Sequence, residues 1–132
     1  MSHTLSREIA MKRLYAETVG GTDTLEDALE QTERGELSDE DAFFSDRLYE
    51  GVHAHCEEID EEIAAHAKDW SITRIAKVDL SILRVAVYEL LYEKNIPVGA
   101  TINEAVELSK AFGGEKSPGF INGVLAAVAK AH

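Results

Sequence analysis

The residues best suited to chemistry are three histidines and the single cysteine near the middle of the chain, His53, His55, Cys56 and His66. They are metal-ligand types, but His55 and Cys56 are adjacent and point in different directions on a helix. Neither has a second histidine or cysteine four residues further on. Cys56 also has no obvious base to activate its thiol. We therefore expect no metal site, no cofactor and no nucleophilic centre here.

Two other segments have the residue types of a ligand loop without its spacing. The acidic run at 57–62 has no glycine for the tight turn of a calcium loop, which favours a solvated helix face. The segment at 113–117 (Gly-Gly-Glu-Lys-Ser) lacks the GxxxxGK[ST] spacing of a phosphate loop and has no strand before it. By elimination, the chain is expected to be a binding module and not an enzyme.

Basic residues near the N-terminus form the first candidate binding surface. Arg7, Lys12 and Arg13 lie at the start of a predicted helix, whose free amides attract phosphates. However, Lys12 and Arg13 lie roughly 140° and 240° around the helix from Arg7. Ordinary surface charge therefore remains the alternative.

The segment at 115–123 is the second candidate surface. Phe120 lies beside glycines and an asparagine, close to Lys116 and Ser117. Its ring could stack on a nucleobase while the lysine meets a phosphate. It could equally be a core residue of the last helix, and the pattern alone favours the core.

Charge is distributed unevenly along the 132 residues, whose net charge is −12. Residues 14–67 carry −15, whereas residues 1–13 carry +2 and residues 68–132 carry +1. A polyanion partner is disfavoured overall, but a nucleic-acid surface survives if the two basic flanks meet in space. We expect Arg7 to lie on the same side of the molecule as Lys116 and Phe120.

Composition is that of one globular domain, with 45% hydrophobic and 29% charged residues. No apolar stretch approaches the roughly 18 residues of a membrane span, and no secretory signal is visible. One cysteine excludes an internal disulfide framework. A soluble cytoplasmic protein that binds no membrane is the default expectation.

Apolar spacing is helical almost everywhere, and no alternating strand pattern is found. The expected class is all-α, with about seven helices in two small antiparallel bundles, residues 1–69 and 70–132. The segment at 78–94 is apolar on most sides and is predicted to be the central helix. The expected helices are Ser6–Val19, Thr24–Arg34, one starting after Ser38–Asp41, Glu57–Ala67, Val78–Lys94, Thr101–Phe112 and one from Pro118 to the end.

Three helix starts have clear signals. Thr101 and Glu104 fit a capping box, and Ser117 before Pro118 fits an N-cap followed by proline. If Asp79 contacts no partner, the alternative is that it is simply the N-cap of the central helix. Whether the helices on either side of Ala54–Cys56 are continuous or kinked is left open.

Long blocks of the chain resemble the family of the transcription antitermination factor NusB. The central segment at 78–90 (VDLSILRVAVYEL) is similar to that family's central helix. Residues 102–112 (INEAVELSKAF) match its INEAVELAK.F block, and residues 120–125 (FINGVL) match its F.NGVL ending. Shorter matches at 7–15, 48–52 and 59–63 extend the resemblance over essentially the whole chain.

The resemblance implies an all-helical RNA-binding regulator of transcription. Such proteins pair with the ribosomal protein NusE, bind boxA-type leader RNA and act on the RNA polymerase elongation complex in ribosomal RNA synthesis. Carried over by position, the RNA contacts are Arg7, Lys116, Ser117 and Phe120, with Lys12 and Arg13 as weaker candidates.

The family's partner surface, carried over in the same way, falls on Tyr15 and Asp79. The dense arginine run that often precedes the position of Arg7 is replaced here by Thr4, Leu5 and Ser6. We therefore expect weak RNA binding by the chain alone. The alternative function is a helical protein-interaction scaffold, or a homodimer, that makes no RNA contact.

Overall fold

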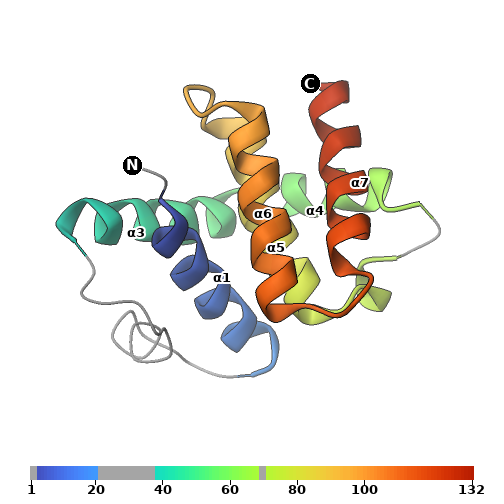
Figure 1. Ribbon diagram of the computed structural model, residues 1–132, viewed down its shortest axis with the longest axis horizontal. Helices are drawn as coiled ribbons and strands as arrows, with labels where there is room; N and C mark the ends of the chain where they lie inside the picture. The colour runs from blue at the N-terminus through green and yellow to red at the C-terminus, as the bar shows by residue number, and fades with distance from the viewer. Residues whose placement is uncertain (1–2, 21–37, 69–70) are drawn as a thin grey trace.

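The computed structural model describes residues 3–20, 38–68 and 71–132, and the regular secondary structure in these segments is helical. The described residues form six α-helices and one 3₁₀ turn, so the expected all-α class is confirmed. The helix expected at Thr24–Arg34 lies outside the described residues. The elements are α1 (Thr4–Thr18), α3 (Asp39–Ala54), α4 (Cys56–His66), η1 (Ile72–Arg74), α5 (Lys77–Tyr92), α6 (Val98–Phe112) and α7 (Ser117–Ala131) (Figure 1).

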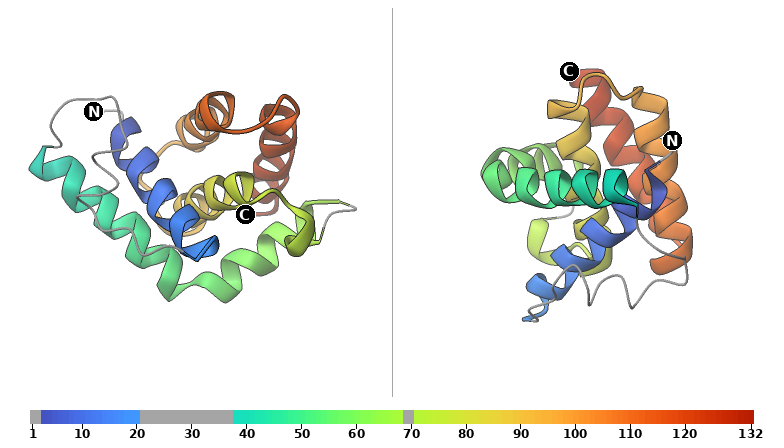
Figure 2. Two further views of the ribbon diagram at one scale, coloured as in Figure 1. Left: turned by 90° about the horizontal axis from the view of Figure 1, so that it is seen from below. Right: turned by 90° about the vertical axis from the view of Figure 1, so that its left-hand side faces the viewer.

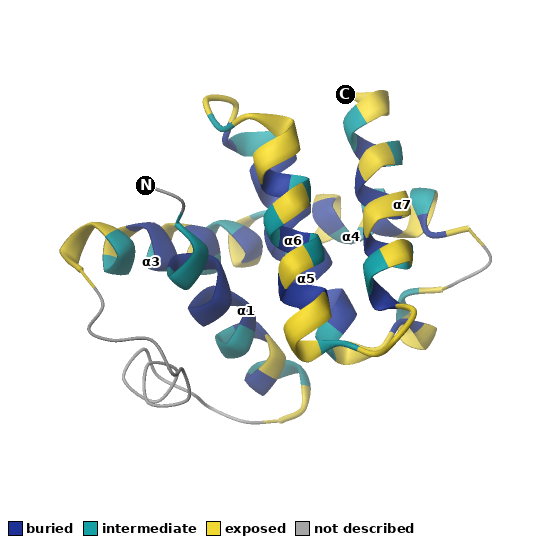
Figure 3. Cartoon of the chain, in the orientation of Figure 1, coloured by how far each residue is buried: buried dark blue, intermediate teal, exposed yellow. Residues whose placement is uncertain are grey.

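The central position of α5 agrees with its apolar sequence. It packs against each of the five other described helices. Seen from below, it lies between the α3–α4 pair on one side and the α6–α7 pair on the other (Figure 2). One buried cluster takes residues from all six helices, and α5 is buried along most of its length (Figure 3). None of the described helices has both the length and the apolar character needed to cross a membrane.

The boundary between α3 and α4 answers the question that the sequence left open. The two helices are separate and meet at His55, whose φ of −119° leaves the helical region. The His55 ring stacks on Tyr92 with 3.9 Å between ring centroids, and the Tyr92 hydroxyl donates to Glu58 of α4. Contacts with the end of α5 therefore hold the break in place.

The predicted start of α6 is wrong. The helix begins at Val98, and the Pro97 carbonyl accepts hydrogen bonds from the amides of Ala100 and Thr101 at 3.0 and 3.2 Å. Thr101 therefore lies inside the helix, where its hydroxyl donates to Glu89 at 3.2 Å. The capping box fails because Thr101 and Glu104 form tertiary contacts instead of bonding to each other's backbone.

The starts of α5 and α7 also differ from the prediction. Ala76 occupies the N-cap position of α5, and Asp79 lies within the first turn. Lys116 occupies the N-cap position of α7, which begins at Ser117. Both predicted caps fail for one reason: the Ser117 hydroxyl donates to the Asp79 carboxylate at 3.0 Å, so the two side chains join α5 to α7.

Gly51 allows α3 to approach α5 closely. A β-carbon added at Gly51 would lie 2.3 Å from the Tyr88 ring, far inside van der Waals contact. Tyr88 is buried, and its hydroxyl donates to Glu93 at 3.0 Å, so the ring has little freedom to move.

Gly51→Ala is expected to lower the free energy of unfolding by about 1–3 kcal/mol, the usual cost of overpacking. Gly123→Ala is the matched control, because a β-carbon there meets nothing within 4 Å. It should instead stabilise α7 by about 0.5–1 kcal/mol. Urea unfolding followed by circular dichroism measures both, and equal effects of the two variants would contradict the close approach.

Candidate nucleic-acid interface

Arg7, the first RNA-contact candidate, is buried and forms an ion pair. Its guanidinium donates to both carboxylate oxygens of Glu89, at 2.8 and 2.7 Å, and lies 3.4 Å from Glu104. Only 4% of Arg7 is exposed. Burial alone lowers the pKa of the guanidinium, but Glu89 and Glu104 outweigh this and raise the pKa above its ordinary value.

The geometry makes Arg7 a connection between helices. The planar guanidinium matches a carboxylate through two parallel hydrogen bonds, a strong and directional arrangement. Through Glu89 and Glu104 it joins α1 to both α5 and α6. In this arrangement Arg7 does not present its charge to an external polyanion.

Lys12 and Arg13 are also engaged within the protein. Lys12 donates to Glu8 at 3.1 Å, and its ammonium lies 4.8 Å from the centre of the Phe112 ring. Arg13 donates to Asp46 at 3.0 Å and lies 3.7 Å from the centre of the Tyr49 ring. The two neighbours point to different helices, α6 and α3, so they form no common patch with Arg7.

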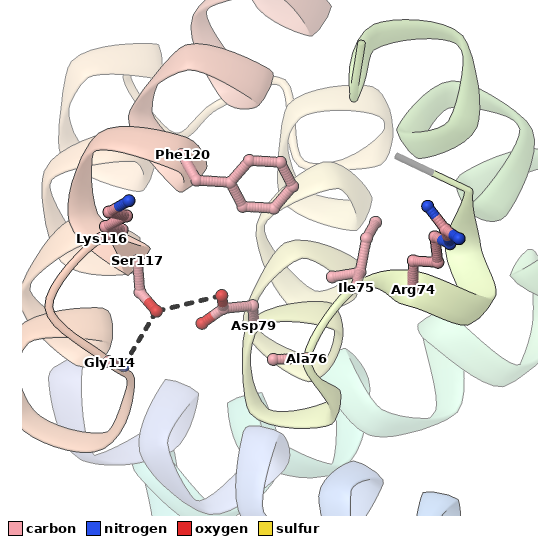
Figure 4. Close-up of a pocket in the computed structure, with 8 residues that line it drawn as sticks. All are labelled: Arg74, Ile75, Ala76, Asp79, Gly114, Lys116, Ser117 and Phe120. Atoms are coloured by element: carbon pink, nitrogen blue, oxygen red, sulfur yellow. Dashed lines mark hydrogen bonds between the residues drawn. The ribbon is translucent and has the colours of Figure 1, made fainter. Parts of the chain in front are cut away.

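The predicted residues at the start of α7 line a cavity of about 440 Å³ between η1, α5 and α7 (Figure 4). Lys116 is exposed on one side of it, whereas Phe120 is half-buried and packs against the core. Phe120 therefore contacts the core, one of the two roles that the sequence left open, and it also lines a cavity. Ser117 is buried and accepts the Gly114 amide at 2.9 Å while it donates to Asp79.

The two partner-contact candidates, Tyr15 and Asp79, lie together. Both line a second cavity, between the end of α1, the start of α5 and the end of α6. Tyr15 and Phe112 are exposed there, at 37% and 39%, and Val78 adds apolar surface. Asp79 is 8% exposed, and its buried Oδ1 atom has no hydrogen-bond partner within the described segments.

The expectation that Arg7 lies on the same side of the molecule as Lys116 and Phe120 is wrong. Arg7 pairs with Glu89 near the end of α5, whereas the cavity of Lys116 and Phe120 contains Asp79 at its start. Ten residues of helix separate these two carboxylates, about 15 Å along the axis. The cause is the antiparallel packing of α1 on α5, which brings Tyr15, and not Arg7, to the start of α5.

Three cations that the sequence did not single out lie with Lys116 at this end of the molecule. We call Lys68, Arg74, Lys77 and Lys116 the basic end. Among the described residues, none of the four forms an ion pair, whereas Arg7, Lys12, Arg13, Arg47, Arg84 and Lys110 all do. These four residues line three neighbouring cavities. The first two share Ala76, Asp79 and Gly114, and Phe120 lines both the first and the third. The only sequence signal for them is the lack of a carboxylate three or four residues away.

Metal-ligand and nucleophile candidates show no catalytic arrangement. No group of three or more His, Cys, Asp or Glu side chains suited to a metal ion occurs in the described segments. The Cys56 thiol lies 3.7 Å from Asp60. Burial and that carboxylate raise the pKa of the thiol, which favours its unreactive protonated form.

Comparison with known proteins agrees with this architecture. The NusB family model matches residues 4–130. The chain belongs to the NusB family. The NusB transcription antitermination protein of Clostridium botulinum (strain Kyoto / Type A2) is 44% identical, over 95% of this chain and 97% of that protein. The corresponding protein of Geobacter sulfurreducens is 46% identical, over 95% and 91%.

Solved NusB structures share the fold of this NusB-family chain. The T. maritima NusB structure has a TM-score of 0.85 at 34% identity and covers 98% of this chain and 92% of that chain. A structure of the antitermination factors NusB and NusE in complex with double-stranded RNA matches with a TM-score of 0.85 at 28% identity, covering 99% and 98%.

Arg7→Met is expected to lower the free energy of unfolding by about 3–5 kcal/mol, because Glu89 is left buried without its counter-ion. Arg7→Met combined with Glu89→Met should recover much of this loss, since no buried charge remains unpaired. Thermal and urea unfolding measure both variants. A stable Arg7→Met protein with reduced RNA affinity would contradict the structural role of Arg7.

Proposed function

We propose that the chain is a transcription antitermination factor that binds boxA-type leader RNA together with NusE and acts on the RNA polymerase elongation complex. Membership of the NusB family supports this, as does the resemblance to a NusB–NusE structure that holds RNA. The role assigned to the chain is binding, with no catalytic step.

One observation carries the proposal: an exposed apolar groove and a set of unpaired cations adjoin each other. The groove is the second cavity described above, which Tyr15 and Phe112 line. The cavity next to it, between η1, α5 and α7, is lined by Arg74 and Lys116. Ala76, Asp79 and Gly114 line both. A protein seated in the groove would therefore lie directly against RNA held at the basic end.

The groove has the features of a protein-docking site. Aromatic side chains that are partly exposed supply much of the binding energy at interfaces. Tyr15 and Phe112 provide two such rings, and Asp79 adds a largely buried carboxylate to the lining. We assign NusE to this groove.

RNA is assigned to the basic end, with Lys116, Ser117 and Phe120 from the start of α7. Lys12 is a secondary contact, because it lies over Phe112 next to the groove. Arg7 and Arg13 support α1 from within, through Glu89 and Asp46. A site with few cations gives modest affinity and a shallow salt dependence, so the chain alone binds RNA weakly.

Binding of a boxA-type RNA is expected to be at least tenfold tighter with NusE present than without it, because two surfaces then contact one RNA. Filter binding at fixed salt, with NusE alone as the control, measures this. Equal affinity with and without NusE would contradict the composite site. RNA binding in neither case, with NusE still captured, would favour the protein-only scaffold, whereas a chain that self-associates and captures neither would favour the homodimer.

Tyr15→Ala is expected to weaken NusE binding by roughly tenfold or more, as loss of a central interface tyrosine does. Phe43→Ala is the matched control, because Phe43 is an aromatic residue that is 69% exposed on α3, away from the groove. Titration calorimetry with NusE compares the two variants, and a melting curve for each shows that the fold is kept. The assignment fails if both variants bind NusE like the unmodified chain.

A further inference from the structure

The lining of the cavity between η1 and α7 is more specific than a general RNA-binding surface. It has apolar walls, a carboxylate at its base and one cation on each side (Figure 4). The walls are Ile75, Ala76 and Phe120, and the carboxylate is Asp79. The cations are Lys116, from the segment before α7, and Arg74, from the end of η1.

We propose that this cavity binds a single nucleotide of single-stranded RNA with its base inward, and that Arg74 is an RNA-binding residue paired with Lys116 across it. The inference rests on the proposed RNA-binding function and deepens it. Arg74 lies on η1, and none of the candidate residues named from the sequence lies on that element. The position of Asp79 in the cavity further gives the orientation of the bound nucleotide.

The orientation follows from the position of Asp79. Asp79 is more than nine-tenths buried. Its Oδ2 atom accepts the Ser117 hydroxyl, and its Oδ1 atom, which is itself buried, has no hydrogen-bond partner among the described residues. A carboxylate repels phosphate oxygens and accepts N–H groups. A nucleotide therefore enters with the N–H edge of its base toward Asp79 and its phosphates outward.

The walls suit a base in that orientation. Phe120 and Ile75 face the same space from α7 and from the residue after η1 (Figure 4). Packing of a base against aromatic and apolar side chains is the usual way in which proteins hold unpaired nucleotides. The cavity volume of about 440 Å³ has room for one base.

The rim suits the phosphates. Arg74 and Lys116 are exposed, and neither forms an ion pair with a described residue. In a chain of net charge −12, most of the described arginines are paired with carboxylates, so an exposed arginine without one is unusual here. Charge complementarity therefore favours an anion, and the apolar walls favour a nucleotide over free phosphate.

The test compares Arg74→Gln with Lys130→Gln, which removes an exposed cation at the far end of α7. Binding of a fluorescent boxA-type RNA to the chain with NusE is measured from about 50 to 200 mM salt, the range in which phosphate contacts are resolved. Arg74→Gln should weaken binding about three- to tenfold and reduce the slope of log K against log salt by about 0.7, the loss of one contact to single-stranded RNA. Lys130→Gln should change neither.

Ultraviolet crosslinking tests the base-inward orientation. Because crosslinks form through the base, the modified peptides should include Ile75 or Phe120. Crosslinks confined to other segments, or an unchanged affinity and salt slope for Arg74→Gln, would overturn the proposal.

Two further outcomes separate this inference from the proposed function. Weaker binding of NusE to Arg74→Gln without RNA would make Arg74 a protein contact and overturn the inference alone. Failure of the unmodified chain to bind RNA, with or without NusE, would overturn the proposed function itself.

Discussion

The ion pair between Arg7 and Glu89 determines how α1 lies on the central helix. A carboxylate that is 2% exposed needs a counter-ion, and Arg7 supplies it through two hydrogen bonds near the start of α1. The eight residues from Arg7 to Tyr15 span about 12 Å of helix, and the ten from Glu89 back to Asp79 span about 15 Å. These lengths are similar, and α1 runs antiparallel to α5. The pair at one end of α5 thus brings Tyr15 to Asp79 at the other end.

Ion pairing also determines which charges remain for a ligand. The acidic segment from α3 to α4 holds several cations: Asp46 binds Arg13, and Asp60 binds Arg84 through two hydrogen bonds. Charges beyond about 10 Å are largely screened at moderate salt. The net charge of −12 therefore has less influence on the basic end than its own four unpaired cations have. A strongly acidic protein can retain a local anion-binding surface in this way.

Much of the fold follows from local signals, and the failures have one cause. Apolar spacing predicts α5, and the Ser38 side chain caps α3 by accepting the Asp41 amide at 3.1 Å. Thr101, Glu104 and Ser117 instead bond to residues distant in the chain, because a buried carboxylate or guanidinium binds them more strongly than a backbone amide does. Arg7 and Arg74 also cannot be told apart from the sequence, since neither has a carboxylate three or four residues away. Only the packing of α5 shows that Arg7 is buried and Arg74 exposed.

Asp79 gives a physical reason for the two proposed ligands to affect each other. It lines both the apolar groove and the cavity between η1 and α7, and it bonds to Ser117 at the start of α7. A protein seated over Tyr15 would remove the small solvent exposure that Asp79 retains, 8%. The attraction between the carboxylate and an N–H donor in the adjoining cavity would then increase, because electrostatic interactions strengthen as the local dielectric falls. Coupling between partner and RNA therefore requires no movement of a helix, only a shared acceptor in the wall between two sites.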